Sequence, residues 1–218
     1  MKSFAVIGCG RFGSSIAKTL FDIGNEVLAV DKNPELVKEI SEHVTYAVEA
    51  DVMDESVLKE LGLSNFDVVI ISIGSSLEAS IMATLIVKEF GVKKVVAKAQ
   101  SELHGKLLAK IGADKVVFPE RDMGVRVAHK LTSNNILDYI ELSPDFSILE
   151  IAAIKSWYNK SLEELKFRNR YGVNVIAIKD KNNISISLDS EQIVREGNIL
   201  VIIGTTEDVK KIELMAAE

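Results

Sequence analysis

The sequence has little of what secreted or membrane-spanning proteins need. It contains one cysteine among 218 residues, so no internal disulfide can form and a reducing compartment is expected. Its longest largely apolar runs, such as VVIISI and ILVIIG, span six residues, far short of the roughly 20 that cross a bilayer. No signal peptide is evident at the start. We therefore expect a soluble, cytoplasmic protein. The single cysteine, Cys9, could be a redox sensor, but we interpret it as a small residue that fills space in a loop.

A surplus of positive charge is also missing. The chain has 26 Lys and Arg against 32 Asp and Glu, a formal net charge of −6. The acidic excess is spread evenly, with 16 basic and 20 acidic residues as far as Pro144 and 10 against 12 beyond it. Because duplex binding depends on a basic face, the composition predicts no nucleic-acid partner.

Short β-branched runs alternate with segments of helical period as far as about residue 120, which is the pattern of a parallel sheet wrapped by helices. The expected strands cover residues 4–8, 26–31, 45–51, 67–73, 94–99 and 115–120, and a last helix covers 120–133. Ser75 and Glu78 have the spacing of a capping box ahead of one helix. Six strands are the number in a full Rossmann sheet. We predict an α/β fold, with a Rossmann-type parallel six-stranded sheet and helices on both faces.

A second, smaller lobe of α+β type is predicted beyond Ser143-Pro144. Its expected strands cover residues 147–154, 174–180, 184–188 and 198–204, with helices at 161–168 and 206–215 and a hairpin turn at 180–183. The predicted domains are a Rossmann domain over 1–133, a linker over 134–146 and a C-terminal domain over 147–218. A lobe of roughly 70 residues is small for an independent core, so we expect it to lean on a second copy of the chain.

Three glycines follow the first predicted strand in the order G-x-G-x-x-G. Gly8 allows a tight turn, Gly10 lets the backbone approach a pyrophosphate, and Gly13 lets the following helix pack closely on the strand. The phosphates would face the N-terminal end of that helix, where unpaired N–H groups and the dipole favour negative charge. Since the motif lies inside a βαβ unit, it indicates a bound nucleotide rather than a turn needed only for packing.

Asp31 ends the second predicted strand, where an acid accepts hydrogen bonds from the adenosine ribose. Its charge would repel a 2′-phosphate, so NAD(H), ATP or ADP is favoured over NADP. Further candidates stand where other strand ends converge on the crevice, although for each alone a solvated loop position is an equal alternative. The candidate nucleotide-binding residues are Gly8, Gly10, Arg11, Phe12, Gly13, Asp31, Lys32, Asp51, Val52, Ser72, Ile73, Gly74, Lys98 and Glu120.

Catalytic machinery is not visible in the sequence. The three histidines, His43, His104 and His129, fall within or between predicted helices, and we interpret His104 as a surface helix residue. No metal-ligand spacing, nucleophile elbow or Walker lysine is present. The alternative from another class is a nucleotide-dependent oxidoreductase with a degenerate substrate lobe. A third alternative, an NADH-sensing transcription factor, needs a DNA-reading element, and no helix-turn-helix with a basic flank is evident.

Several segments together resemble one protein family. They are FAVIGCGRFGSSIAKTL, EVLAVDKNPELV, DVVIISIG, VVAKAQSELH, KIGADKVVFPERDMG and the lobe from about residue 147 onward. Over essentially its whole length the chain resembles the KtrA/TrkA family of RCK proteins, which regulate the conductance of potassium, and its length is similar to the KtrA type. The resemblance implies a non-enzymatic cytosolic subunit in an octameric ring built from dimers, docked on the inner face of a separate membrane subunit that conducts potassium.

The resemblance also assigns roles to the residues that match the family's ligand site. It implies that Gly8, Gly10 and Gly13 hold the phosphates, Asp31 the ribose, and Asp51 and Ser72 the adenosine, with Lys98 close by. Arg11 resembles the family arginine that reaches terminal phosphates, in some members those of a neighbouring subunit, and is our candidate for the γ-phosphate contact. Glu120 resembles an acid that helps bind a cation, Mg or Na, at the subunit interface. In this family ATP and ADP favour different ring shapes, and some members bind NAD(H).

The C-terminal lobe resembles the RCK C-terminal regulatory domain, which in several family members binds cyclic di-AMP between two copies. Arg168 resembles the family arginine at the phosphates, and Asn174 and Ile176 lie on the strand that lines that site. A histidine found further along in the family has no counterpart in KDKNNISIS. The alternative is that Lys166, Arg168 and Arg170 form a solvated basic rim.

Overall fold

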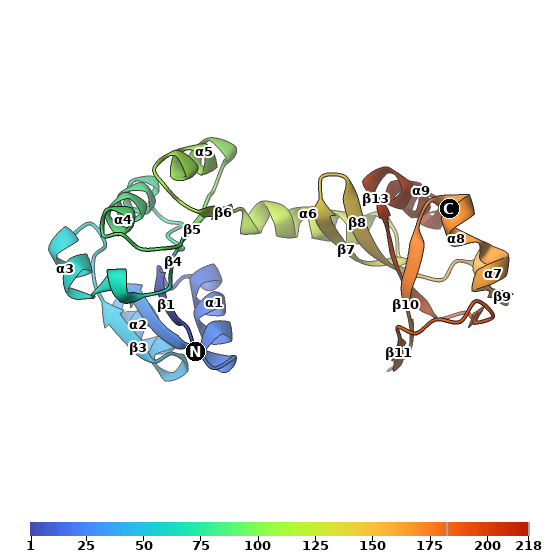
Figure 1. Ribbon diagram of the computed structural model, residues 1–218, viewed down its shortest axis with the longest axis horizontal. Coiled ribbons are helices and arrows are strands. Elements are labelled where there is room, and N and C mark those ends of the chain that lie inside the picture. Colours follow the sequence, from blue (N-terminus) through green and yellow to red (C-terminus); the bar gives the residue numbers. More distant parts are fainter. Residues whose placement is uncertain (182, 218) are drawn as a thin grey trace. The chain divides into compact units, whose positions relative to one another are not determined.

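The computed structural model describes residues 1–181 and 183–217 of the chain. These residues form two compact units that divide after Glu120, and each unit has a hydrophobic core of its own. The unit at the blue end of the chain alternates strands and helices, whereas the other contains a sheet with helices beside it (Figure 1).

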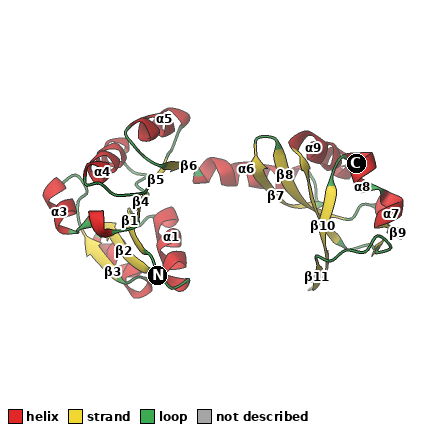
Figure 2. Cartoon of the chain, in the orientation of Figure 1, coloured by secondary structure: helices red, strands yellow, loops and turns green. Residues whose placement is uncertain are grey.

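The first unit is built around a fully parallel sheet. Its strands lie in the order β3-β2-β1-β4-β5-β6, and helices alternate with them along the chain (Figure 2). The elements are β1 (Ser3–Ile7), α1 (Arg11–Asp22), β2 (Glu26–Asp31), α2 (Pro34–Ile40), β3 (Tyr46–Glu49), α3 (Glu55–Glu60), β4 (Val68–Ile71), α4 (Leu77–Glu89), β5 (Val95–Lys98), α5 (Glu102–Lys110) and β6 (Lys115–Val117). The predicted Rossmann-type sheet is confirmed.

Both faces of this sheet are covered because its central strands are apolar on both sides. In β1, Ala5 and Ile7 belong to the core that also contains Leu108 of α5, whereas Val6 belongs to the core that contains Ala17 of α1. The pleat sends successive side chains to opposite faces, so one apolar strand serves two layers of helices.

Four helices of this unit begin with a side-chain cap and an acidic residue in the first turn. The caps are Asn33 for α2, Asp54 for α3, Ser76 for α4 and Ser101 for α5. The cap of α4 is therefore not the predicted Ser75. Ser76 has the extended backbone that an N-cap needs, and its hydroxyl accepts the N–H of Ala79 at 3.1 Å.

The second unit contains a five-stranded antiparallel sheet in the order β11-β10-β13-β8-β7 and a two-stranded sheet of β9 and β12. Its elements are β7 (Ile136–Ser143), β8 (Phe146–Ala152), β9 (Lys160–Ser161), α7 (Leu162–Leu165), α8 (Phe167–Tyr171), β10 (Asn174–Asp180), β11 (Asn183–Ser185), β12 (Ile193–Val194), β13 (Ile199–Thr205) and α9 (Thr206–Ala217). Trp157 is fully buried and belongs to the hydrophobic core of this unit. The predicted hairpin is present as β10 and β11, although Asn182 of its turn lies outside the described residues.

The predicted boundaries need correction, because residues 136–143 form strand β7 where a linker was expected. β7 pairs with β8 along most of its length, and two register shifts interrupt the alternation that would have revealed it in the sequence. Helix α6 (Pro119–Thr132) starts in the first unit, but its later turns bind the second. Arg126 donates to Asp138 at 2.7 Å, and the ring of His129 stacks on Tyr139 with 3.8 Å between centroids.

Throughout the part of the chain that the structure describes, no helix combines the length and apolar character needed to cross a bilayer.

Candidate nucleotide-binding site

A cleft of about 730 Å³ opens at the carboxyl ends of the strands in the first unit. It lies where the chain order of the strands reverses, between β1 and β4, which is the position at which open α/β sheets bind ligands. Its volume suits a small organic ligand. The lining residues are Gly8, Gly10, Arg11, Phe12, Val30, Asp31, Lys32, Asn33, Leu36, Ala50, Asp51, Val52, Met53, Ser72, Ile73, Gly74, Ser75, Ser76, Glu78, Ala79, Lys98 and Glu120.

Thirteen of the fourteen candidate nucleotide-binding residues line this cleft, and the exception is Gly13. A Cβ atom on Gly13 would lie 2.5 Å from Oγ of Ser72, so Gly13 acts in packing α1 against the strands. Gly8 has φ +96° at the turn itself. Around the Cβ position of Gly10, by contrast, no described atom lies within 4 Å. The open side of Gly10 is where a ligand can approach the backbone.

Helix α1 begins at this loop without the features that complete the neighbouring helices. Among the described residues no side chain caps it at Gly10, and its first turn holds no acid. The first N–H groups of a helix lack partners within the helix, and they carry the positive end of the dipole. Since α2 to α5 are all capped, the α1 terminus is left available to an anion in the cleft.

Asp31 connects the end of β2 to the glycine loop. One carboxylate oxygen accepts the N–H of Cys9 at 2.6 Å, and the other accepts the N–H of Asn33 at 2.8 Å. These bonds fix the carboxylate at the rim of the cleft, and each oxygen keeps a second lone pair for a ribose hydroxyl. Lys32 follows it as an exposed cation. Asp51, two residues after the end of β3, accepts the N–H of Met53 at 3.0 Å.

Cys9 and Ser72 support the loop from inside. Burial, with a smaller contribution from the charge of Asp31, raises the pKa of the Cys9 thiol to about 12, so the side chain is a neutral space-filling group. Ser72 is buried, and its hydroxyl donates to the carbonyl of Gly8 at 2.9 Å. The structure thus supports the interpretation of Cys9 as a loop filler. Ser72 both lines the cleft and holds the glycine loop through its hydrogen bond to Gly8.

Two side chains from β5 and α6 meet at the other end of the cleft. Nζ of Lys98 lies 2.5 Å from Oε1 of Glu120 and 5.8 Å from the centre of the Phe12 ring. The Lys98 hydrogen bond is the main reason that the pKa of Glu120 lies below its ordinary value. Beyond Lys98, the side-chain amide of Gln100 donates to the carbonyl of Gly74.

Several lining residues were missed by the sequence analysis. They are mostly apolar or small, and they come from the end of β2, the loops after β2, β3 and β4, and the first turns of α2 and α4: Val30, Asn33, Leu36, Ala50, Met53, Ser75, Ser76, Glu78 and Ala79. The glycine motif describes only the first strand-to-helix turn, so it carries no information about these loops. Their position in the chain could have identified them, because each stands at a strand end or within the turn that follows it.

The histidines do not supply catalytic groups to the described lining of the cleft. His104 is buried at 3% exposure rather than on the helix surface, and its Nδ1 accepts the N–H of Gln100 at 3.3 Å. Burial lowers the pKa of His104, which keeps it neutral. The cleft lining that the structure describes contains no histidine, cysteine or tyrosine.

Comparison with known proteins decides the family. Residues 4–119 match the TrkA-N domain, and residues 147–216 match the TrkA-C domain. The chain is 47% identical over 212 residues to the Ktr system potassium uptake protein C of Bacillus subtilis (strain 168), covering 97% of this chain and 96% of that protein. The chain belongs to the KtrA/TrkA family of RCK proteins. The resemblance recognised in the sequence is therefore confirmed.

A second sequence relative agrees with this KtrA-type assignment. The Ktr system potassium uptake protein A of the same organism is 45% identical, with 97% of this chain and 96% of that protein covered. These relatives are named for potassium uptake, in agreement with the prediction that the chain is not an enzyme.

Two solved structures are similar to this chain in fold. The crystal structure of the GsuK RCK domain matches 100% of this chain and 48% of its own, with TM-score 0.69 and 20% identity. The NAD(P)-binding domain of an exopolyphosphatase-related protein from Archaeoglobus fulgidus matches 60% of this KtrA-type chain and 98% of its own, with TM-score 0.53 and 25% identity.

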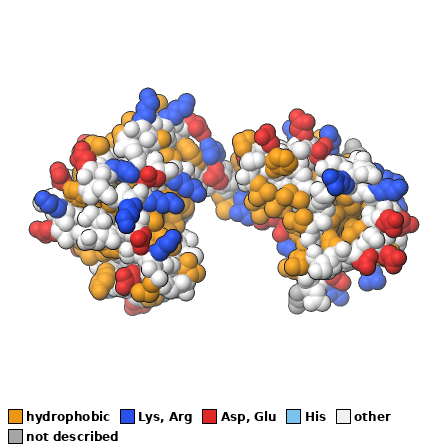
Figure 3. All heavy atoms as spheres, in the orientation of Figure 1, with side chains coloured by type: hydrophobic (Ala, Val, Ile, Leu, Met, Phe, Trp, Pro, Cys, Tyr) orange, Lys and Arg blue, Asp and Glu red, His pale blue; other side chains and the backbone are white. Residues whose placement is uncertain are grey.

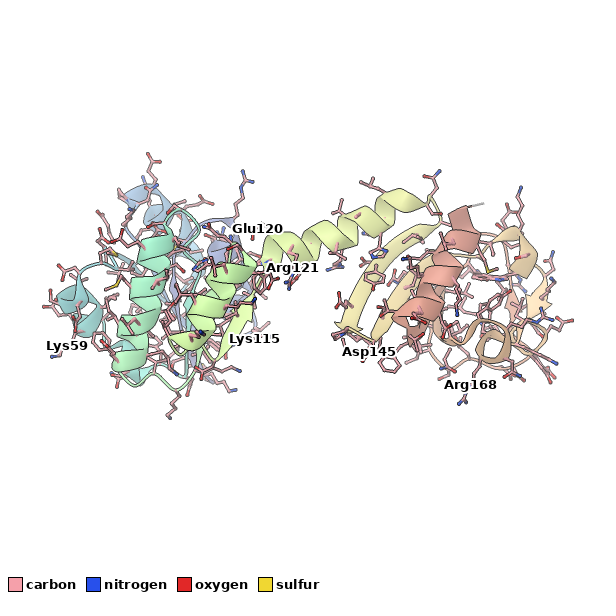
Figure 4. All side chains as sticks on the ribbon, turned by 90° about the horizontal axis from the view of Figure 1, so that it is seen from above. Lys59, Lys115, Glu120, Arg121, Asp145 and Arg168 are labelled. Carbon is pink, nitrogen blue, oxygen red and sulfur yellow. The ribbon has the colours of Figure 1, made fainter. Side chains whose placement is uncertain are left out.

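The residues assigned to a second ligand lie in the other unit of this KtrA-type chain. Arg168 is exposed on α8 and is labelled in Figure 4, and Asn174 and Ile176 are exposed on β10. A second cleft of about 330 Å³ in this unit is lined by residues of β10, β11 and the segment 192–198, and none of the three is in its lining.

A cation site in this KtrA-type chain was predicted at Glu120. Its carboxylate faces the ammonium group of Lys98, and among the described residues no group of three His, Cys, Asp or Glu side chains could hold a metal ion. A single carboxylate already paired with a lysine is a poor cation ligand. Glu120 and the other described residues of one chain therefore do not by themselves make up a cation site.

Proposed function

We propose that this chain is a cytoplasmic regulatory subunit of a potassium uptake system, which binds an adenine nucleotide in the cleft of its first unit and gates a separate membrane subunit. The observation that carries the nucleotide assignment is the pairing of two features across one cleft. The uncapped start of α1, with the open side of Gly10, suits phosphates, and the fixed carboxylate of Asp31 suits a ribose.

ATP or ADP fits this cleft better than NAD(H) does, although NAD(H) remains the alternative ligand. A dinucleotide would place its second base and ribose, which carry no terminal phosphate, toward the ends of β4 to β6. That end carries the charged groups of Lys98 and Glu120, and Arg11 adds a further cation to the lining. Cationic side chains favour the distal phosphates of a mononucleotide.

The membrane partner and the ring are supported by the relatives and by the surface. The names of the two Bacillus relatives point to a potassium uptake system. In the second unit, large apolar side chains are exposed, among them Leu142, Phe146, Ile184 and Ile186 at 53%, 51%, 60% and 77%. Apolar side chains gather on the visible face of this unit (Figure 3). Such exposure favours association, and we propose dimers assembled to an octameric ring.

Two further ligands belong to the proposal. Cyclic di-AMP would bind between two copies of the second unit at Arg168, Asn174 and Ile176, whose exposure leaves them open to a ligand or a partner copy. A Mg or Na ion beside the nucleotide would need oxygen ligands from phosphate and a neighbouring subunit in addition to Glu120.

Two measurements on the purified chain test these assignments. One is calorimetric titration with ATP, ADP, NADH and cyclic di-AMP, each with and without Mg²⁺ or Na⁺. The other is the mass of the protein in solution. Binding of ATP and ADP by an octamer supports the proposal. If a dimer binds NADH alone and oxidises it in the presence of a hydride acceptor, the alternative function as an oxidoreductase would be favoured instead. Gating itself is tested by potassium flux through the reconstituted membrane partner, with nucleotide as the only variable.

A further inference from the structure

The second cleft of the chain, of about 330 Å³, lies wholly within the second unit. The hairpin of β10 and β11 forms one side of it, and the segment 192–198 ahead of β13 forms the other; the hairpin can be followed in Figure 1. The volume falls at the lower end of the range for small-molecule sites. The cleft therefore suits a ligand smaller than a nucleotide.

This cleft lies on the opposite face of the large sheet from Asn174, one of the residues assigned to cyclic di-AMP. Val175 packs against the hydrophobic core and Ile178 belongs to it, so both side chains point to the core face of β10. Asn174 precedes Val175 and is exposed, which places it on the other face because neighbouring side chains of a strand alternate. Since Ile178 lines the cleft, a ligand in it lies on the core face, away from Asn174.

Three polar side chains stand in a row along this cleft. Asp180 of β10 pairs with Asn183 of β11. The pairing of Lys179 with Ile199 places Asn198, the residue before β13, beside Asp180 on its other side. All three members of the row line the cleft, and directly opposed residues of antiparallel strands share a face. The row thus presents a carboxylate between two amides.

The polar groups of this row do not satisfy one another. Asn198 is 5% exposed, and its Oδ1 accepts the N–H of Arg195 at 2.9 Å, but none of the described residues accepts a hydrogen bond from its Nδ2. The carboxylate of Asp180 likewise has no hydrogen-bond or ion-pair partner in the described part of the chain. A nearly buried donor without a protein partner costs free energy unless a ligand or water meets it. Asn198 therefore offers a donor to whatever enters the cleft.

Arg195 supplies the opposite charge. It is an exposed residue that lines the same cleft, and among residues 1–181 and 183–217 no acid lies within ion-pair distance of its guanidinium. Its backbone is fixed, because the N–H of Asn198 donates to the carbonyl of Arg195 at 3.1 Å in a turn where Gly197 has φ +80°. Arg195 and Asp180 thus bring unpaired charges of both signs to one cleft. Such an arrangement suits a ligand that carries both charges.

Two isoleucines add an apolar part to the lining. Ile178 is 3% exposed and Ile193 is 40% exposed, and both line the cleft. An apolar group of a ligand would cover them and remove their remaining surface from water. The cleft therefore combines a cation, an anion and an apolar surface within a small volume.

We propose that this cleft binds a free α-amino acid with an apolar side chain. Arg195 and Nδ2 of Asn198 donate to its carboxylate, Asp180 accepts from its ammonium group, and its side chain covers the two isoleucines. Asp180 and Asn198 stand on neighbouring strands, and the spacing of strands matches the short distance between the two charged groups of an α-amino acid. The site gives the second unit a metabolite input that does not rest on the proposed nucleotide binding.

Calorimetric titration of the full chain with L-leucine tests the proposal, beside two matched compounds that each lack one charge. L-leucinamide keeps the ammonium group, and isocaproate, which is leucine without its amino group, keeps the carboxylate. We expect each to bind at least about tenfold more weakly than leucine, because each leaves one charged side chain without its partner. Glycine, which lacks the apolar side chain, should also bind about tenfold more weakly.

Two variants assign the two charges to the two ends of the ligand. Arg195→Gln should weaken leucine and isocaproate about tenfold and leave leucinamide within about twofold. Asp180→Asn should weaken leucine and leucinamide and spare isocaproate. Arg170→Gln and Asp145→Asn are the matched controls, because both positions are exposed in the same unit but do not line the cleft. The controls should bind leucine as the unaltered chain does, and thermal unfolding checks that every variant is folded.

Several results would overturn the proposal. One is the absence of leucine binding. Another is a leucinamide or isocaproate that binds as tightly as leucine, which would make the cleft a site for a cation or an anion alone. Equal losses of leucine affinity in the cleft variants and the controls would show a general charge effect instead.

Hydrogen exchange locates the bound leucine. Saturating leucine should slow exchange in residues 192–198, because the ligand connects that segment with the hairpin. Exchange that slows only in the first unit would place leucine elsewhere and would overturn the site even if the affinity were high.

Discussion

A Cβ atom on Gly13 would lie 1.9 Å from the carbonyl oxygen of Gly8, closer than any real carbon can approach it. Helix α1 and the loop after β1 are therefore in direct backbone contact. The contact brings the start of α1 against the end of the strand, where its free N–H groups border the cleft. Packing at Gly13 and the open side of Gly10 are separate requirements within one motif.

Alanine substitutions separate these two requirements. Gly13→Ala must push α1 away from Gly8 and should destabilise the first unit by about 2 kcal/mol or more. Gly10→Ala meets no described atom within 4 Å, so it should keep the melting temperature and lose nucleotide affinity. Gly124→Ala in α6, outside the cleft, is the control, since its Cβ position is equally open. Normal nucleotide affinity in Gly10→Ala would contradict the assigned phosphate position.

Asp31 should matter for folding as well as for binding. Asp31→Ala removes the acceptor of the buried Cys9 N–H, which costs about 1–3 kcal/mol when no replacement is found. Asp51→Ala also loses a backbone partner, the N–H of Met53, but at an exposed turn where water replaces it. Urea unfolding should show a clearly larger loss for Asp31→Ala. Equal losses would mean that the bond to Cys9 contributes nothing.

The Cys9 thiol should be unreactive in the folded chain. A pKa of about 12 leaves about one thiol in ten thousand ionised at pH 8, and only the thiolate reacts with iodoacetamide. We expect labelling at pH 8 to be slow and to reach the rate of a free thiol only in denaturant. Fast labelling of the folded protein would reopen the redox interpretation.

Asp138 should give the second unit an acid-sensitive contribution to stability. The hydrogen bond from Arg126 is the main cause that lowers the pKa of Asp138 in the folded state. The stabilisation is therefore present above the ordinary pKa of an aspartate, and it is lost as pH falls through the lower folded value. Asp138→Asn should cost about 1 kcal/mol at pH 7, a modest value because the pair is partly exposed.

Urea unfolding from pH 7 to pH 3 measures this contribution. The difference between Asp138→Asn and the unaltered chain should shrink on acidification, since both then carry a neutral side chain. Asp145→Asn, at an exposed turn of the same unit, should show no such trend. A difference that stays constant with pH would assign the loss to packing instead.

Local sequence patterns were enough to predict the fold of the first unit and about half of the residues that line its cleft. The glycine spacing and Asp31 were recognisable because a βαβ turn places its ligand groups at fixed positions along the chain. Strand β7 was not recognisable in the sequence, because its register shifts against β8 break the alternation of inward and outward side chains. His104 was misplaced because most residues of its helix are exposed, and only the packing of α5 decides that His104, Gly105 and Leu108 form the inner face.

The sequence by itself determined the parallel sheet, the glycine loop after β1 and the acid at the end of β2, since each depends on residues close together in the chain. Tertiary structure alone decided that Lys98 meets Glu120, 22 residues away, and that Ser72 holds Gly8 across 64 residues. Such pairs form where the carboxyl ends of parallel strands converge. That convergence is set by strand order and register, which hydrogen bonding between distant segments fixes and local composition does not encode.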